Sequence, residues 1–147
     1  SSDGYYYLAA SVYNSDYSRL RVNADHQIYY LTCANVDFGT CSSVGSTLDS
    51  TSNKAHYINL CSGVRGKFTA ANISLSDAGN LYGVLIASSE MCSIDVNVSS
   101  STNPGAGAFI GIDGTNTKRS TAYGVISAVD TLTANVSTMN TAALRTT

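Results

Sequence analysis

The chain of 147 residues is poor in charge and contains no tryptophan, a single proline and a single glutamate, Glu90. Charged residues make up 12 % of it and the formal net charge is −2, whereas soluble domains usually carry about 25 % charged residues. The eight Lys and Arg residues are spread out, with only Arg19/Arg21 and Lys118/Arg119 close together. Nucleic-acid binding needs clustered cations, so we expect no nucleic-acid partner.

Long hydrophobic runs are missing as well. The longest largely apolar stretch, residues 5–12, is much too short to cross a bilayer as a helix. The chain does not open with a basic segment followed by an apolar one. We therefore expect no membrane span and no signal peptide in it. Solubility that rests on Ser, Thr and Asn rather than on charge favours an extracellular or virion-surface location.

The sequence also lacks motifs for catalysis, cofactors and metals. Residues 105–107 are too short for a phosphate loop, and no nucleophile elbow occurs. His26 and His56 lack the spacing of zinc ligands, and His56 at a strand start is typical of a structural histidine. Glycoside hydrolysis needs two placed carboxylates, but Asp77 and Asp113 lie in turn-like sequences. We expect no catalytic residue, no cofactor and no metal.

Four cysteines are present, Cys33, Cys41, Cys61 and Cys92. An even number in a non-cytoplasmic composition is compatible with two disulfides, and four cysteines allow three pairings. One pairing joins Cys33 to Cys41 across a short loop and Cys61 to Cys92. The alternative interpretation is four buried thiols acting as small hydrophobic residues. The sequence leaves both open.

Short strand patterns separated by Ser, Asn, Gly and Asp turns fill the chain. Ile94, Val96 and Val98 alternate onto one face of a strand, as do Tyr82, Val84 and Ile86. We expect a single all-β domain over residues 1–147, with residues 138–147 forming a short helix or a frayed end. The expected strands are 5–13, 19–23, 28–36, 56–61, 67–75, 82–86, 94–98, 107–112, 122–129 and 132–137.

A four-residue pattern recurs: a small or apolar residue, Asn, a β-branched residue, then Ser or Asp. Its asparagines are Asn35, Asn72, Asn97 and Asn135, and only the interval between Asn72 and Asn97 lies in the twenties. A period in the twenties, lengthened elsewhere by inserted loops, is typical of stacked β-solenoid coils, in which equivalent asparagines form a ladder facing the core. Three copies also match the N-glycosylation sequon. Glycosylation at these positions would require the asparagines to be exposed rather than to face the core.

Residues 82–89, followed by residues 92–99, resemble a rung of the right-handed parallel β-helices of the pectate-lyase-like family. Both combine a Gly-Val or Gly-Ile strand, a Ser-rich turn and a short strand near an asparagine. The resemblance extends over about residues 54–137. It implies a parallel β-helix of the kind found in bacteriophage tailspikes. If the chain is an enzyme, the resemblance implies a polysaccharide lyase or glycoside hydrolase.

A β-sandwich or jelly roll is the alternative fold, because short strands spaced by about 8–12 residues also fit two packed sheets. A sandwich completed by a strand from a neighbouring subunit builds extracellular filaments. The tyrosine-rich first strand is the candidate for such an exchange. This alternative predicts a disulfide-stabilised, pilin-like filament subunit.

Tyrosine is abundant, with ten copies. Five of them crowd the N-terminal region, where amphipathic rings suit both sugar contacts and subunit interfaces. These candidates are Tyr5, Tyr6, Tyr7, Tyr13 and Tyr17. We therefore predict a structural or attachment domain of a tailspike- or fibre-like assembly that self-associates, as a trimer or filament, and binds surface carbohydrate.

Overall fold

The structure, a computed structural model, describes residues 5–17, 21–24, 27–45, 47–48, 53–75, 79–100, 109–127, 132–136 and 139–146. All regular structure in this part of the chain is β-strand, so the prediction of an all-β protein is confirmed. None of the described residues belongs to a helix that could span a bilayer.

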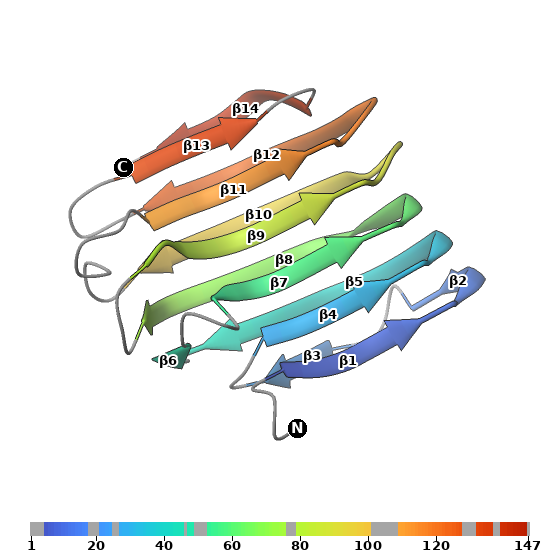
Figure 1. The fold of residues 1–147 in the computed structure, drawn as a ribbon, viewed down its shortest axis with the longest axis horizontal. Helices are drawn as coiled ribbons and strands as arrows, with labels where there is room; N and C mark the ends of the chain where they lie inside the picture. Colours follow the sequence, from blue (N-terminus) through green and yellow to red (C-terminus); the bar gives the residue numbers. More distant parts are fainter. Residues whose placement is uncertain are drawn as a thin grey trace.

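The strands form two sheets that lie as two layers (Figure 1). The six-stranded sheet contains β1 (Tyr5–Ala10), β4 (Gln27–Leu31), β7 (Lys54–Asn59), β9 (Leu81–Ala87), β11 (Phe109–Thr115) and β13 (Leu132–Val136), in that order. The eight-stranded sheet contains β2 (Tyr13–Asp16), β5 (Ala34–Val44), β8 (Ser62–Leu75), β10 (Ser93–Ser100), β12 (Ser120–Ser127) and β14 (Met139–Thr146), with β3 (Arg21–Ala24) beside β5 and β6 (Thr47–Leu48) beside β8.

All described strand pairs are parallel. Parallel neighbours need a long crossover between them, and here each crossover is a strand of the other sheet. A jelly roll would instead pair its strands antiparallel. We call each strand of the six-stranded sheet, together with the next main strand of the other sheet, a repeat; successive repeats stack from the N-terminal to the C-terminal end (Figure 1).

In the six-stranded sheet, paired residues of β4, β7, β9 and β11 are 28 positions apart in the chain, and the same spacing separates the hydrogen-bonded residues Cys33 and Cys61. Ile28 pairs with His56, His56 with Val84, and Val84 with Ile112. The same spacing relates paired residues of β8, β10 and β12 in the other sheet. The intervals at both ends of the stack are shorter, because Tyr5 pairs with Gln27 and Phe109 pairs with Leu132. A period in the twenties was expected, but the recurring asparagines are not separated by the 28 positions that relate paired residues.

Side chains that alternate inward from both sheets fill the space between the layers. In β10 the inward residues Ile94, Val96 and Val98 are buried and the intervening Asn97 is exposed, as the alternation predicts. An aromatic cluster lies at the N-terminal part of this core, where Tyr30 contacts Phe38 and Phe68 edge to face with ring centroids 5.0 and 5.4 Å apart.

Buried His56 joins the two sheets through this aromatic cluster. The Tyr30 hydroxyl donates to His56 Nδ1 over 3.0 Å, and His56 Nε2 donates to the carbonyl of Thr69 over 2.8 Å. These partners assign the neutral imidazole with its proton on Nε2. Burial lowers the pKa of His56 to about 4, in agreement with the expected structural role. His26 lies outside the described residues.

Two expectations about the elements are wrong. The C-terminal segment is neither helical nor frayed, because residues 139–146 form β14 and pair with β12. The strands expected over residues 5–13 and 28–36 are each divided by a corner, at Ser11 and at Thr32, where φ is positive. Local alternation continues through such a corner, so the sequence pattern gives no sign of the break.

Candidate functional site: a groove along one corner of the sheets

An open groove of about 680 Å³ runs along the corner at which strands of the six-stranded sheet lead into strands of the eight-stranded sheet. Its lining comes from five successive repeats: Tyr13; Thr32, Cys33 and Ala34; Leu60, Cys61 and Ser62; Ser88, Ser89 and Glu90; Asn116 and Lys118.

The lining forms three columns whose members recur at the spacing of the repeats, because neighbouring repeats stay in register across the corner. One rim is Thr32, Leu60, Ser88 and Asn116; the floor is Cys33, Cys61 and Ser89; the other rim is Ala34, Ser62, Glu90 and Lys118. The floor residues are buried, whereas Leu60 on the first rim is 54 % exposed. A ligand in the groove would therefore lie across several repeats.

Backbone hydrogen bonds hold the corner rigid. The first-rim residues Thr32, Leu60 and Ser88 adopt positive φ angles of 52, 56 and 49°. Each donates its N–H to a carbonyl in the next repeat, over 3.0–3.1 Å. The left-handed conformation costs a non-glycine residue about 1 kcal/mol, and these bonds stabilise it against that cost.

Each floor residue has a thiol sulfur or a hydroxyl oxygen in its side chain. Cys61 Sγ accepts the N–H of Cys33 over 3.3 Å, and Ser89 Oγ accepts the N–H of Cys61 over 3.0 Å. The same Cys61 and Ser89 side chains donate to carbonyls two residues earlier in the chain. An alanine or valine on the floor would leave these buried amides without a partner, at about 1–3 kcal/mol each.

All four cysteines are free and buried, as in the second of the two sequence interpretations. Neither the Cys33–Cys41 nor the Cys61–Cys92 disulfide is present. Instead the structure brings Cys33 and Cys61 together on the groove floor. A hydrogen bond from the Cys61 thiol lowers the pKa of Cys33, and the same bond raises the pKa of Cys61.

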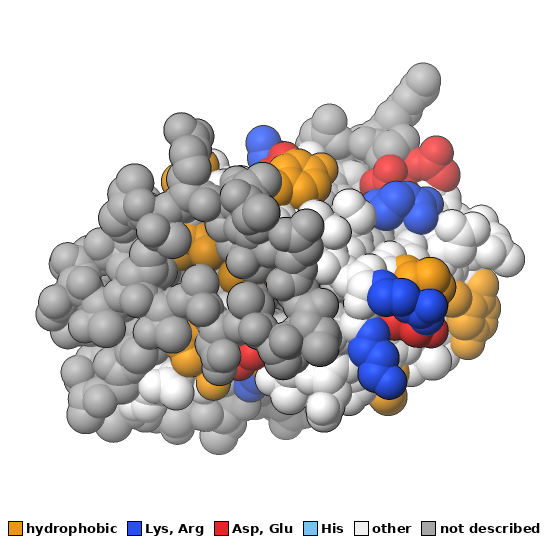
Figure 2. Space-filling model, turned by 90° about the horizontal axis from the view of Figure 1, so that it is seen from above, with side chains coloured by type: hydrophobic (Ala, Val, Ile, Leu, Met, Phe, Trp, Pro, Cys, Tyr) orange, Lys and Arg blue, Asp and Glu red, His pale blue; other side chains and the backbone are white. Residues whose placement is uncertain are grey.

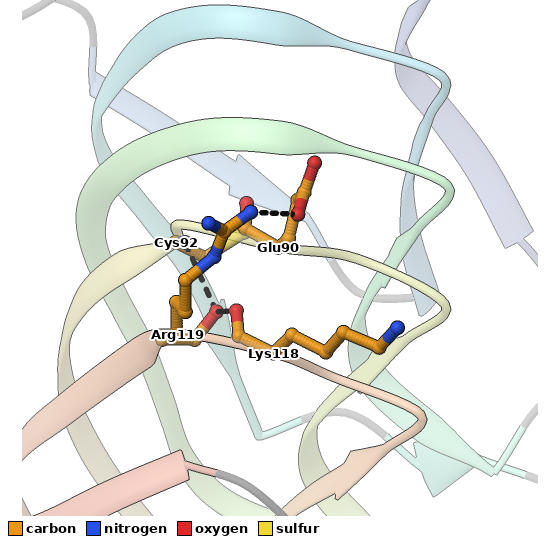
Figure 3. Close-up of polar contacts among 5 residues, drawn as sticks. Glu90, Cys92, Lys118 and Arg119 are labelled. Carbon is orange, nitrogen blue, oxygen red and sulfur yellow. Dashed lines mark hydrogen bonds and ion pairs between the residues drawn. The ribbon is translucent and has the colours of Figure 1, made fainter.

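The charged residues that line the groove, Glu90 and Lys118, lie on the second rim at its C-terminal end. Glu90 and Arg119 point toward one another, with Arg119 Nη2 and Glu90 Oε2 2.6 Å apart, whereas Lys118 points away (Figure 3). Both side chains of the pair are exposed, at 41 and 70 %, so the pair contributes little stability. On the described part of the face in Figure 2, basic side chains lie beside acidic and hydrophobic ones rather than in one large basic patch.

Of the five tyrosines predicted as contact residues, the structure describes the side chains of two, Tyr13 and Tyr17. Tyr13 lines the groove and is 54 % exposed. Tyr17 stacks on Phe38 with ring centroids 6.4 Å apart. The side chains of Tyr5, Tyr6 and Tyr7 lie outside those that the structure describes, although their backbone belongs to β1.

A second aromatic cluster, which the sequence analysis missed, lies on the outer face of the six-stranded sheet. Tyr29 and Tyr57 are partners in register and meet edge to face at 4.6 Å. Lys54 Nζ lies 5.3 Å from the ring centroid of Tyr57 and 5.6 Å from that of Tyr82. The signal in the sequence is that Tyr57 follows Tyr29 at the spacing of the repeats.

The predicted asparagine ladder in the core is wrong for the described side chains. Asn35, Asn72 and Asn97 are all exposed. Asn35 bonds Asn14 and Arg65 on the surface, over 3.1 and 3.2 Å. The copies are also not equivalent, because Asn97 is in β10 of the eight-stranded sheet and Asn135 is in β13 of the other sheet. The side chain of Asn135 lies outside those described.

The recurring pattern misled because its spacing is not that of the repeats. The residues that do recur with the repeats are a Cys, Ser or Thr on the floor (Cys33, Cys61, Ser89, Thr117) between two rim positions of varied type. Comparison of the chain with family models, with curated proteins and with solved structures found no match.

Proposed function

We propose that the two sheets are faces of a parallel β-helix, and that the chain is an attachment domain of a tailspike- or fibre-like assembly at the surface of a virion or cell. The parallel pairing, and a register that keeps one spacing from β4 through β7 and β9 to β11, support this fold. The same fold follows from the resemblance of residues 54–137 to pectate-lyase-like repeats. The low charge of 12 % is consistent with such a location.

The groove carries the proposal that this domain binds carbohydrate. Its rims offer hydroxyl and amide groups at Thr32, Ser88 and Asn116, in line across the repeats. Tyr13 adds an exposed aromatic ring, a common platform for a sugar face. Because the columns repeat from strand to strand at about 4.8 Å, the groove suits a linear polysaccharide better than a compact ligand.

Binding rather than cleavage is the better interpretation of this groove. Glycoside hydrolysis uses two carboxylates on either side of the bond. Among the described residues that line the groove, Glu90 is the only acidic one. Its carboxylate is bound by Arg119, with Arg119 Nη2 and Glu90 Oε2 2.6 Å apart.

Self-association is part of the proposal. In the described pairing, β1 and β13 are the end strands of the six-stranded sheet, and such edges carry free backbone donors and acceptors. The pilin-like alternative requires β1 to leave its own chain, but β1 is paired there with β4. Its disulfides are not present either. No observation favours this alternative.

A glycan array of linear bacterial surface polysaccharides tests the binding proposal, with the Tyr13→Ala variant compared to wild type. Loss of this aromatic contact should weaken binding by about tenfold. The matched control is Tyr123→Ala, because Tyr123 is 42 % exposed on β12 and does not line the groove. Equal weakening in both variants, or no binding by wild type, would contradict the proposal.

A further inference from the structure

Cys33 and Cys61 occupy the same corner position in successive repeats. The flanking pairs Leu31–Asn59 and Ala34–Ser62 are in register, so the two backbones run side by side at the usual strand spacing of about 4.8 Å. Disulfides join Cα atoms that are about 4.4–6.8 Å apart. The N–H of Cys33 already lies 3.3 Å from Cys61 Sγ.

Cys33 differs from the other three cysteines, because its pKa is lowered whereas the pKa values of Cys41, Cys61 and Cys92 are raised. In the structure the Cys61 thiol donates to the Asn59 carbonyl; turned toward a Cys33 thiolate, the same proton stabilises it, and this lowers the pKa of Cys33. Burial raises the pKa of both Cys41 and Cys92. Because the thiolate is the form that reacts with oxidants, Cys33 should react first. Cys33 is 1 % exposed and lies directly beneath the open groove that it lines.

We propose that Cys33 and Cys61 are an oxidant-sensitive dithiol that closes to a disulfide between two successive repeats. With hydrogen peroxide as oxidant, the Cys33 thiolate attacks one peroxide oxygen, the O–O bond breaks, and protonation yields a sulfenic acid and one water. The Cys61 sulfur then displaces the hydroxyl of that sulfenic acid, forming the S–S bond and a second water. Two thiols are oxidised and one peroxide is reduced.

This link would fix the floor of the groove between the second and third repeats. A disulfide restricts the unfolded chain, so the oxidised protein should unfold at a higher temperature, and a reductant should reverse the gain. Neither the site nor its chemistry depends on the proposed carbohydrate binding.

The test is peroxide treatment of the folded protein, followed by alkylation of the remaining thiols in denaturant and peptide mass mapping. We expect the loss of two of the four thiols, a mass decrease of two hydrogen atoms, and one cross-linked peptide that contains Cys33 and Cys61. Four unreacted thiols, under conditions that oxidise the unfolded chain, would overturn the proposal. A link through Cys41, through Cys92 or to a second chain would overturn it as well.

Serine substitutions give matched controls, because the next repeat has Ser89 at this floor position. In Cys61→Ser the hydroxyl keeps an acceptor for the Cys33 amide, and the Cys33 sulfenic acid should persist and be trapped by dimedone. Cys33→Ser should leave no intramolecular disulfide. The double variant Cys41→Ala, Cys92→Ala should still form the link, and its failure to do so while folded would count against the assignment.

Discussion

His56 is the residue at which burial, hydrogen bonding and protonation are most tightly connected. Its imidazole accepts from the Tyr30 hydroxyl and donates to the Thr69 carbonyl, so one neutral side chain serves both sheets. A protonated ring would lose its acceptor on Nδ1 and place a charge in the core. Burial therefore lowers the pKa of His56 from 6.5 to about 4.

Acidification should destabilise the protein through His56. Between pH 6.5 and 4 the unfolded chain binds a proton at His56 and the folded chain does not, so stability falls as the pH decreases. At about 1.4 kcal/mol per pH unit the loss reaches about 3 kcal/mol near pH 4. Urea unfolding at pH 7, 6, 5 and 4.5 measures it.

The control for this pH dependence is the double variant Tyr30→Phe, His56→Val. Valine occupies the equivalent position in the next repeat, at Val84, and phenylalanine removes the hydroxyl that would lose its acceptor. The variant should show a much smaller decrease in unfolding free energy over the same pH range. A wild-type decrease that persists unchanged in the variant would show that another group is responsible.

At the scale of the elements, facing strands compensate for each other's side-chain size. Ala55, Gly83 and Gly111 follow each other in β7, β9 and β11, and Ala70, Val98 and Ile126 do so in β8, β10 and β12. A Cβ added to Gly83 would meet Val98, and one added to Gly111 would meet Ile126. Where the six-stranded sheet has glycine instead of alanine, the other sheet has valine or isoleucine instead of alanine.

The Gly111–Ile126 pair allows a double-mutant cycle. In Gly111→Ala the new Cβ would overlap Ile126 Cγ2 and lie 2.7 Å from Cδ1, so overpacking should cost about 1–3 kcal/mol. Ile126→Ala alone should cost about 2–5 kcal/mol through the cavity that it leaves. The double variant recreates the Ala55 and Ala70 combination and should be more stable than the sum of the two losses allows.

Chemical denaturation of the four proteins gives the coupling energy of this cycle, which we expect at about 1–2 kcal/mol. The matched control is the same cycle with Ile94→Ala in place of Ile126→Ala. Ile94 is a buried residue of β10 and is not among the atoms nearest to a Cβ on Gly111. Additive losses in the Gly111–Ile126 cycle would contradict the packing argument.

At the scale of the whole molecule, the stack of repeats leaves a sheet edge at each end of the described pairing, at β1 and β13. Sedimentation velocity over a range of protein concentrations, with reductant present throughout, should detect species heavier than one chain. The reductant excludes association through the cysteines. A single species with the mass of one chain at all concentrations would contradict the proposed self-association.

The sequence by itself determined the all-β class and the position of most strands, because alternation of buried and exposed residues is a local property. Ile94, Val96 and Val98 illustrate this, since all three are buried as their alternation predicted. Low charge and the absence of cation clusters are equally local facts of composition.

Only the tertiary structure decided which residues become neighbours between repeats. Which residues become neighbours depends on the number of residues in each repeat. The register of β5 with β8 also shifts between Asp37 and Thr40, and this shift cannot be read from the sequence of either strand alone. The register between the second and third repeats places Cys33 beside Cys61 and Asn35 on the surface, whereas the recurring asparagines indicated other spacings. The groove follows from the same register, because its rims and floor are columns formed by the same corner in successive repeats.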